Sequence, residues 1–153
     1  MAIEKKSLKD VSTNLRTQFQ KGQNELNKNN VKYAIELLKF VVQREPGFME
    51  AREALRTAER NYSDAMGGFK KFLGQLKAGK FLVRAKGTMS KNPKAAMSDI
   101  EEALAIYLYS SAALNTLADA AKVAEAHFIA IEALEIIRET EPANEQKDRK
   151  SVV

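Results

Sequence analysis

The sequence predicts an all-α protein built from antiparallel helix pairs. Apolar residues recur at spacings of three and four along most of its 153 residues, which is the period of one helix face. Clusters of Gly, Pro and Asn separate these stretches and predict turns. Small residues and prolines also recur at a fixed spacing of twelve residues, in the sets Gly22, Ala34, Pro46 and Ala118, Ala130, Pro142.

Three helices are expected in the first part of the chain. Ser7 or Asp10 can cap the first helix. Its apolar row consists of Leu8, Val11, Leu15, Phe19, Gly22 and Leu26. After the turn-forming residues 27–30, a second helix covers 31–42 and stops before Pro46-Gly47. A third helix covers 48–65 and stops at Met66-Gly67-Gly68.

In the second part of the chain, the sequence predicts further helices, the first of which are short. We expect a short helix near 69–77, a helix at 80–89, and a partner at 93–109 that starts with Pro93 after Asn92. Ser110 or Ser111 can cap the next helix, and the last one ends at Pro142. Residues 124–126 separate these two helices without Gly or Pro, so a single long helix is an alternative.

The small residues and closing prolines resemble the tetratricopeptide repeat, a helix pair of 34 residues. Ala96 and Ala130 are 34 residues apart. The resemblance implies a short right-handed solenoid over 15–142, with a helix start or cap at 1–14. A polar tail, or the start of a further repeat, follows at 143–153. The implied units are 15–48, 49–76, 77–110 and 111–142. An irregular helical bundle is the alternative fold.

Two departures from the repeat pattern affect the middle units. Arg56 and Arg84 stand where the first helix of a unit carries a small residue, and the unit 77–110 lacks its closing proline.

The resemblance implies a protein–protein interaction scaffold that binds a peptide or a partner helix in a groove. The first helix of each pair lines this groove in the family. The matching positions are Arg16, Phe19, Gln23, Glu53, Arg60, Phe81, Asn115, Asp119 and Lys122. Many such repeats bind acidic C-terminal tails through a Lys and Asn clamp, which is absent here because Phe19 and Gln23 occupy those positions.

The charge distribution offers an alternative function. Residues 65–98 hold eight basic groups and no acid, whereas residues 99–153 hold 5 basic and 11 acidic groups. A nucleic acid or another polyanion could bind Lys70, Lys71, Lys77, Lys80 and Arg84. We rank nucleic acid lower, because Phe69, Phe72 and Phe81 are expected in the core rather than exposed for base stacking. A solvated helix face accounts for the same residues without any ligand.

No residue pattern predicts catalysis or a cofactor. The chain has no cysteine, and its single histidine, His127, has no metal-ligand spacing around it. Glu101, Glu102, Glu132, Glu135 and Glu139 are expected on exposed helix faces. The apolar stretches fall short of the ~18 residues that cross a bilayer, and the N-terminus lacks a secretory signal. We therefore expect a cytoplasmic, non-enzymatic protein with no cofactor, no metal and no membrane partner.

Self-association is a third functional class. Each unit of a repeat array leaves an apolar face for its neighbour. Phe128, Ile131 and Leu134 form this face on the last expected helix. We expect either that the chain is the front piece of a longer array or that another copy covers this face, so the sequence predicts a homodimer or a larger contact through the C-terminal unit.

Replacing Ala130 with Leu is expected to overpack a helix crossing, because Ala34, Ala96 and Ala130 are the positions predicted to be small and buried. The free energy of unfolding should fall by ~1–3 kcal/mol. Chemical denaturation followed by circular dichroism measures this change. An unchanged midpoint would place Ala130 on the surface and contradict the helix register.

Overall fold

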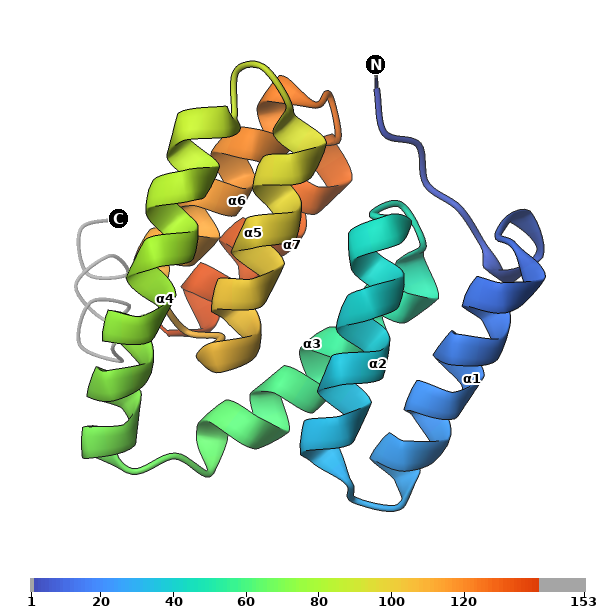
Figure 1. Ribbon diagram of the computed structural model, residues 1–153, viewed down its shortest axis with the longest axis horizontal. Coiled ribbons are helices and arrows are strands. Elements are labelled where there is room, and N and C mark those ends of the chain that lie inside the picture. Colours follow the sequence, from blue (N-terminus) through green and yellow to red (C-terminus); the bar gives the residue numbers. More distant parts are fainter. Residues whose placement is uncertain (1, 141–153) are drawn as a thin grey trace, which may run out of the picture.

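The computed structural model describes residues 2–140, which form seven α-helices (Figure 1). The helices are α1 (Thr13–Asn27), α2 (Val31–Arg44), α3 (Met49–Asp64), α4 (Gly68–Thr88), α5 (Pro93–Ile106), α6 (Ser111–Val123) and α7 (His127–Glu139). An isolated bridge between Lys6 and Phe48 is the only extended pairing within these residues. The all-α prediction is confirmed for this part of the chain. Pro142 and the expected 143–153 segment lie outside it.

Side-chain caps define several helix starts. Ser12, Asn92 and Ser110 each accept a hydrogen bond from a backbone N–H in the first turn of α1, α5 and α6, respectively. The expected start at Asn92-Pro93 and the Ser110 cap are confirmed. The first helix begins at Thr13 rather than near Leu8, which lies in a separate 3-10 turn, η1 (Leu8–Asp10).

The turn expected at 124–126 is present, so α6 and α7 are two helices rather than one. Glu125 adopts a positive φ of 57°, a left-handed conformation that ends a helix. The backbone N–H of Ala126 then donates to the carbonyl of Ala121, which satisfies one of the last acceptors of α6.

The middle of the chain differs from the prediction, because Gly68–Thr88 is one continuous helix instead of two short ones. A glycine costs a helix only ~1 kcal/mol relative to alanine, so Gly74 and Gly79 weaken α4 without ending it. A Cβ on Gly74 would lie 3.2 Å from Ile106 Cγ2, so this glycine permits close packing of α4 on α5. The expected unit boundary between 76 and 77 therefore falls inside α4.

The helices form two lobes with separate cores (Figure 1). Helices α1–α3 enclose Phe19, Leu38, Phe48 and Leu55, and α4–α7 enclose the second core. Consecutive helices pack on each other everywhere except between α3 and α4, where the chain passes from one lobe to the other without extensive contact. Helix α2 lies beside α5 where the lobes meet.

The small residues that were predicted at helix crossings, Ala34, Ala96 and Ala130, are all buried. A Cβ on Gly22 would lie 2.8 Å from the side chain of Leu38, so α1 and α2 approach closely at this point. The 34-residue register does not extend to Gly68, which is exposed and has nothing within 4 Å of an added Cβ.

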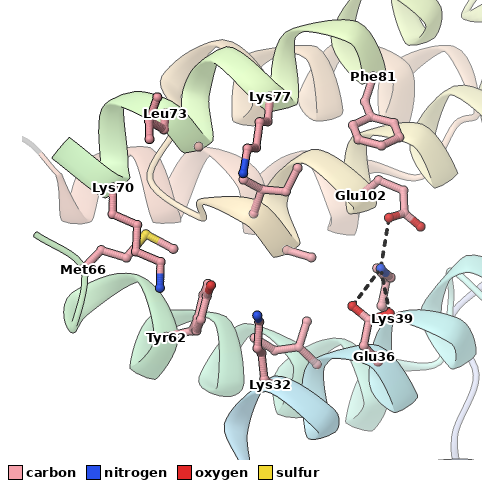
Figure 2. A pocket seen from close by; sticks show the side chains of 14 residues that line it. Lys32, Glu36, Lys39, Tyr62, Met66, Lys70, Leu73, Lys77, Phe81 and Glu102 are labelled. Atoms are coloured by element: carbon pink, nitrogen blue, oxygen red, sulfur yellow. Dashed lines mark hydrogen bonds and ion pairs between the residues drawn. The ribbon is translucent and has the colours of Figure 1, made fainter. Parts of the chain in front are cut away.

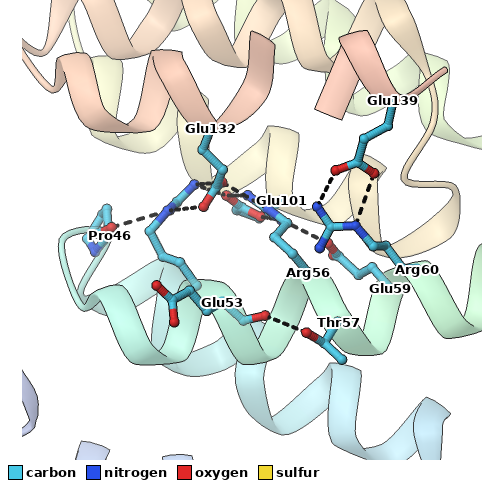
Figure 3. A network of polar contacts seen from close by, with 10 residues as sticks. Pro46, Glu53, Arg56, Thr57, Glu59, Arg60, Glu101, Glu132 and Glu139 are labelled. Atoms are coloured by element: carbon cyan, nitrogen blue, oxygen red, sulfur yellow. Dashed lines mark hydrogen bonds and ion pairs between the residues drawn. The ribbon is translucent and has the colours of Figure 1, made fainter. Parts of the chain in front are cut away.

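A buried network of ion pairs joins α3 to the second lobe (Figure 3). Arg56 binds both carboxylate oxygens of Glu101 on α5 at 2.8 Å. Arg52 and Arg56 also bind Glu132 on α7, at 2.7 and 2.9 Å. Both arginines are 1% exposed. The expectation that Glu101 and Glu132 lie on exposed helix faces is therefore wrong, because these carboxylates neutralise the two arginines.

The network contains one more carboxylate than cation. Glu59 on α3 is fully buried and accepts from Arg56 through Oε1 at 2.8 Å, whereas its Oε2 has no partner among the described residues. Burial raises the pKa of Glu59 to about 7, with Glu101 and Glu132 adding to the effect and Arg56 opposing it. For Glu132, burial is outweighed by Arg56 and Arg52, which lower its pKa to about 2.

Glu59→Gln is expected to reduce the loss of stability at neutral and alkaline pH. The pKa of Glu59 is higher in the folded protein than the ordinary glutamate value of 4.5. The contribution of Glu59 to the free energy of unfolding is therefore fully present below pH ~4.5 and is lost as the pH rises through ~7. Between pH 5 and pH 8, the wild type should lose about 2 kcal/mol more of its free energy of unfolding than the variant.

Urea denaturation at the two pH values measures this difference. Glu135→Gln, at an exposed position on α7, is the matched control and should follow the wild type. Equal pH dependence of Glu59→Gln and wild type would contradict a protonated Glu59 in the folded state.

Candidate functional site

An open cleft of about 340 Å³ lies between the two lobes (Figure 2). Helices α2 and α3 form one wall, and α4 and α5 form the other. Apolar parts of the lining come from Ile35, Met66, Leu73, Gly74, Ala105 and Ile106, with the rings of Tyr62 and Phe81 at the sides. The cleft exists because α3 and α4 diverge, and within residues 2–140 they are the only consecutive helices that do not pack extensively on each other.

Three lysines direct their ammonium groups into this cleft from opposite walls (Figure 2). Lys32 comes from α2, whereas Lys70 and Lys77 come from α4, where a spacing of seven residues places them on the same side of the helix. None of the three forms an ion pair within residues 2–140. Lys70 Nζ lies 5.1 Å from the centre of the Tyr62 ring, a cation–π distance.

A fourth lysine closes one end of the cleft and is already neutralised. Lys39 Nζ lies 2.9 Å from Glu102 of α5 and 3.2 Å from Glu36. Burial lowers the pKa of Lys39, but the carboxylate of Glu102 outweighs burial, so that the pKa of Lys39 is raised. Gln43 also donates to Glu102, at 3.1 Å. This group ties α2 to α5, and it leaves Lys32, Lys70 and Lys77 as the cations available to a ligand.

The predicted basic residues separate into different environments. Lys70 and Lys77 enter the cleft, whereas Arg84 pairs with Asp99 at 3.0 Å. Lys80 lies over the ring of Phe81, with its Nζ 5.1 Å from the ring centre, and Lys71 is half-buried. Lys32 was missed from the sequence. It precedes Lys70 by 38 residues, and no local pattern indicates that α2 and α4 face each other.

The residues predicted for a groove on the first helices lie in several places. Phe19 is 4% exposed and stacks near Phe48 in the core, so its assignment to an accessible groove is wrong. Arg60 is held by both oxygens of Glu139, at 2.7 and 3.1 Å. Phe81 lines the cleft. Exposed positions are Gln23 on α1, Glu53 on α3, and Asn115, Asp119 and Lys122 on α6, and Arg16 is half-buried.

Two aromatic residues expected in the core are on the surface. Phe69 and Phe72 on α4 are exposed, and only Phe81 of the three is partly buried. The expectation is wrong because the buried side of α4 is formed by Gly74, Ala78 and Ala85, whose small side chains let the helix approach α5 and α6 closely.

The C-terminal apolar face is partly accessible. Ile131 and Leu134 are exposed on α7, while Phe128 is half-buried. Lys5 lies over the Phe128 ring, at 5.6 Å from its centre. The homodimer through this face stays a prediction, which sedimentation at high protein concentration would test.

Metal-ligand groups and helices that could span a membrane are both absent from residues 2–140. No group of three His, Asp or Glu side chains in this range could hold a metal ion. None of its helices combines the length and the apolar character needed to cross a membrane.

Comparison with known proteins found no match for this chain among protein-family models, curated proteins or solved structures. The tetratricopeptide likeness therefore stays a resemblance of residue spacing.

Proposed function

We propose that this protein is a non-catalytic binding module that holds an acidic segment of a partner protein in the cleft between its two lobes. The observation that carries this proposal is the convergence of Lys32, Lys70 and Lys77 over an apolar floor. Unpaired cations beside apolar surface favour a ligand that has carboxylates and apolar side chains together.

The dimensions of the cleft favour a short segment as its ligand. A volume of about 340 Å³ lies at the lower end of the range for small-ligand sites and accommodates a few side chains. Carboxylates of the ligand would pair with the three lysines, and its apolar side chains would pack near Ile35, Leu73 and Ile106. The lining carboxylates Glu36 and Glu102 are already paired with Lys39, so they would not repel such a ligand strongly.

The proposed scaffold is a short tetratricopeptide-like stack of helix pairs, interrupted between α3 and α4. The buried small residues at Gly22, Ala34, Ala96 and Ala130 support this description. An irregular bundle is the alternative. In either case we assign binding to the interlobe cleft rather than to a groove on the first helices, since Phe19 is in the core and Arg60 is paired with Glu139.

A single-stranded nucleic acid is the second candidate ligand. Exposed Phe69 and Phe72 beside Lys70 and Lys71 combine stacking surface with positive charge, which is the pattern of sequence-independent strand binding. If a single-stranded nucleic acid is the ligand, the affinity of the protein for it should fall steeply as the salt concentration rises, because each neutralised phosphate releases counterions.

Charge reversal in the cleft tests the proposal. Lys70→Glu/Lys77→Glu should weaken binding of a fluorescent peptide with alternating Glu and Leu by at least about tenfold, since two charge-assisted contacts become repulsive. Fluorescence anisotropy with the full chain measures the dissociation constant. A peptide with Lys in place of Glu should not bind to the wild type.

Lys9→Glu/Lys122→Glu is the matched control, because it changes the net charge equally at exposed positions that do not line the cleft. It should change the affinity by less than about twofold, apart from weak long-range effects. An equal loss in both double variants would contradict a specific cleft. Tighter binding of a single-stranded oligonucleotide, with a steep salt dependence, would favour the second candidate.

A further inference from the structure

A row of large apolar side chains runs along the solvent side of α4. Phe69, Phe72, Leu76 and Val83 are 75%, 59%, 63% and 74% exposed. The opposite side of the helix carries Gly74, Ala78 and Ala85, which are buried against the second lobe. The row is thus apolar surface in excess of what the fold buries, and a cluster of this kind on one face marks an interaction site.

The spacing of this row is that of a helix–helix seam. Phe69, Leu76 and Val83 are separated by seven residues each, and Phe72 follows Phe69 by three. The row covers 14 residue steps, or about 21 Å of helix. Lys80 flanks it on one side, and Gln75 and Lys86 flank it on the other. Such a narrow row fits one partner helix, whereas a helix lying in a membrane surface presents a broader apolar face.

Gly79 leaves a gap in the row. It follows Leu76 by three residues and precedes Val83 by four, so it lies on the same side of α4. A Cβ built at this position would have nothing within 4 Å. A large apolar side chain of an opposing helix could enter this gap, as a knob enters a hole in a coiled coil.

The charge of α4 defines the chemistry of its partner. The helix carries six basic residues and no acidic one, namely Lys70, Lys71, Lys77, Lys80, Arg84 and Lys86. Pairing of two copies of α4 would bring like charges together along the whole seam, which disfavours a second copy. A helix with carboxylates beside its apolar residues would complement these charges.

We propose that the solvent face of α4 binds an acidic amphipathic helix of a partner protein. The apolar residues of that helix pack on Phe69, Phe72, Leu76 and Val83, and its carboxylates face the flanking lysines. This surface is distinct from the cleft, which uses the side of α4 that carries Lys70, Gly74 and Lys77. The proposal therefore does not require an occupied cleft.

The probe is a 21-residue synthetic peptide with Leu at heptad positions a and d and Glu at b, c, e and g. Binding to the full chain is measured by fluorescence anisotropy. Leu76→Ser/Val83→Ser should weaken binding at least about tenfold, because Leu76 lies at the centre of the seam and Val83 is one of its most exposed side chains. Circular dichroism and thermal melting verify that the variant stays folded, as expected for exposed positions.

Leu8→Ser/Val123→Ser is the matched control, since it removes two exposed apolar side chains that lie neither on α4 nor on the predicted homodimer face. It should alter the affinity by less than about twofold. A peptide with Lys in place of Glu should not bind.

Four results would overturn the proposal. The first is no binding of the acidic peptide. The second is binding that is unchanged in Leu76→Ser/Val83→Ser but abolished in Lys70→Glu/Lys77→Glu. This result would place the peptide in the cleft and leave the proposed function intact. The third is binding of vesicles containing phosphatidylglycerol through the row. The fourth is self-association of the wild type, seen by sedimentation, that Leu76→Ser/Val83→Ser abolishes.

Discussion

The relative position of the two lobes depends on the buried ion pairs of Arg52 and Arg56 with Glu101 and Glu132, together with the contact of α2 with α5. Helices α3 and α4 pack little on each other, so the peptide connection alone does not fix the distance between the lobes. Breaking a buried ion pair by removing one partner costs about 3–5 kcal/mol, whereas the intact pair adds little net stability over an apolar substitute. We infer that the network acts mainly by specifying geometry, and that the width of the lysine cleft follows from it.

Internal ion pairs, including those of this network, account for part of the acidic charge of the chain. The chain carries 25 basic and 20 acidic groups, but many of the acidic groups are used internally. Glu101 and Glu132 neutralise arginines of α3, Glu139 holds Arg60, and Glu102 holds Lys39. On α4 only Arg84 has a carboxylate partner among the described residues. An acidic ligand therefore meets several unpaired cations and no carboxylate along α4, on both its cleft side and its solvent side.

Most helix positions and several caps could be predicted, whereas the surroundings of α4 could not. Its apolar residues occupy two sides of the helix, and periodicity alone does not show which side is buried. Assigning Phe69 and Phe72 to the core assumed that large aromatic side chains are buried first. Close packing on Gly74, Ala78 and Ala85 instead left the large side chains in solvent. Of the three lysines in the cleft, Lys70 and Lys77 could be predicted as ligand-binding residues because they lie in the basic segment 65–98. No sequence pattern around Lys32 indicated that it would join them.

The sequence by itself determined the helical class, most of the turns and the burial of the small residues Ala34, Ala96 and Ala130. Each of these depends on neighbours within about one or two helical turns, so the signal is local. Only the tertiary structure decided which charged residues are buried and which are free. Arg56 and Glu101 are 45 residues apart, and Arg52 and Glu132 are 80 apart. Pairing over such separations depends on how the lobes pack, and an exposed and a buried glutamate can occupy equivalent positions in a helical pattern.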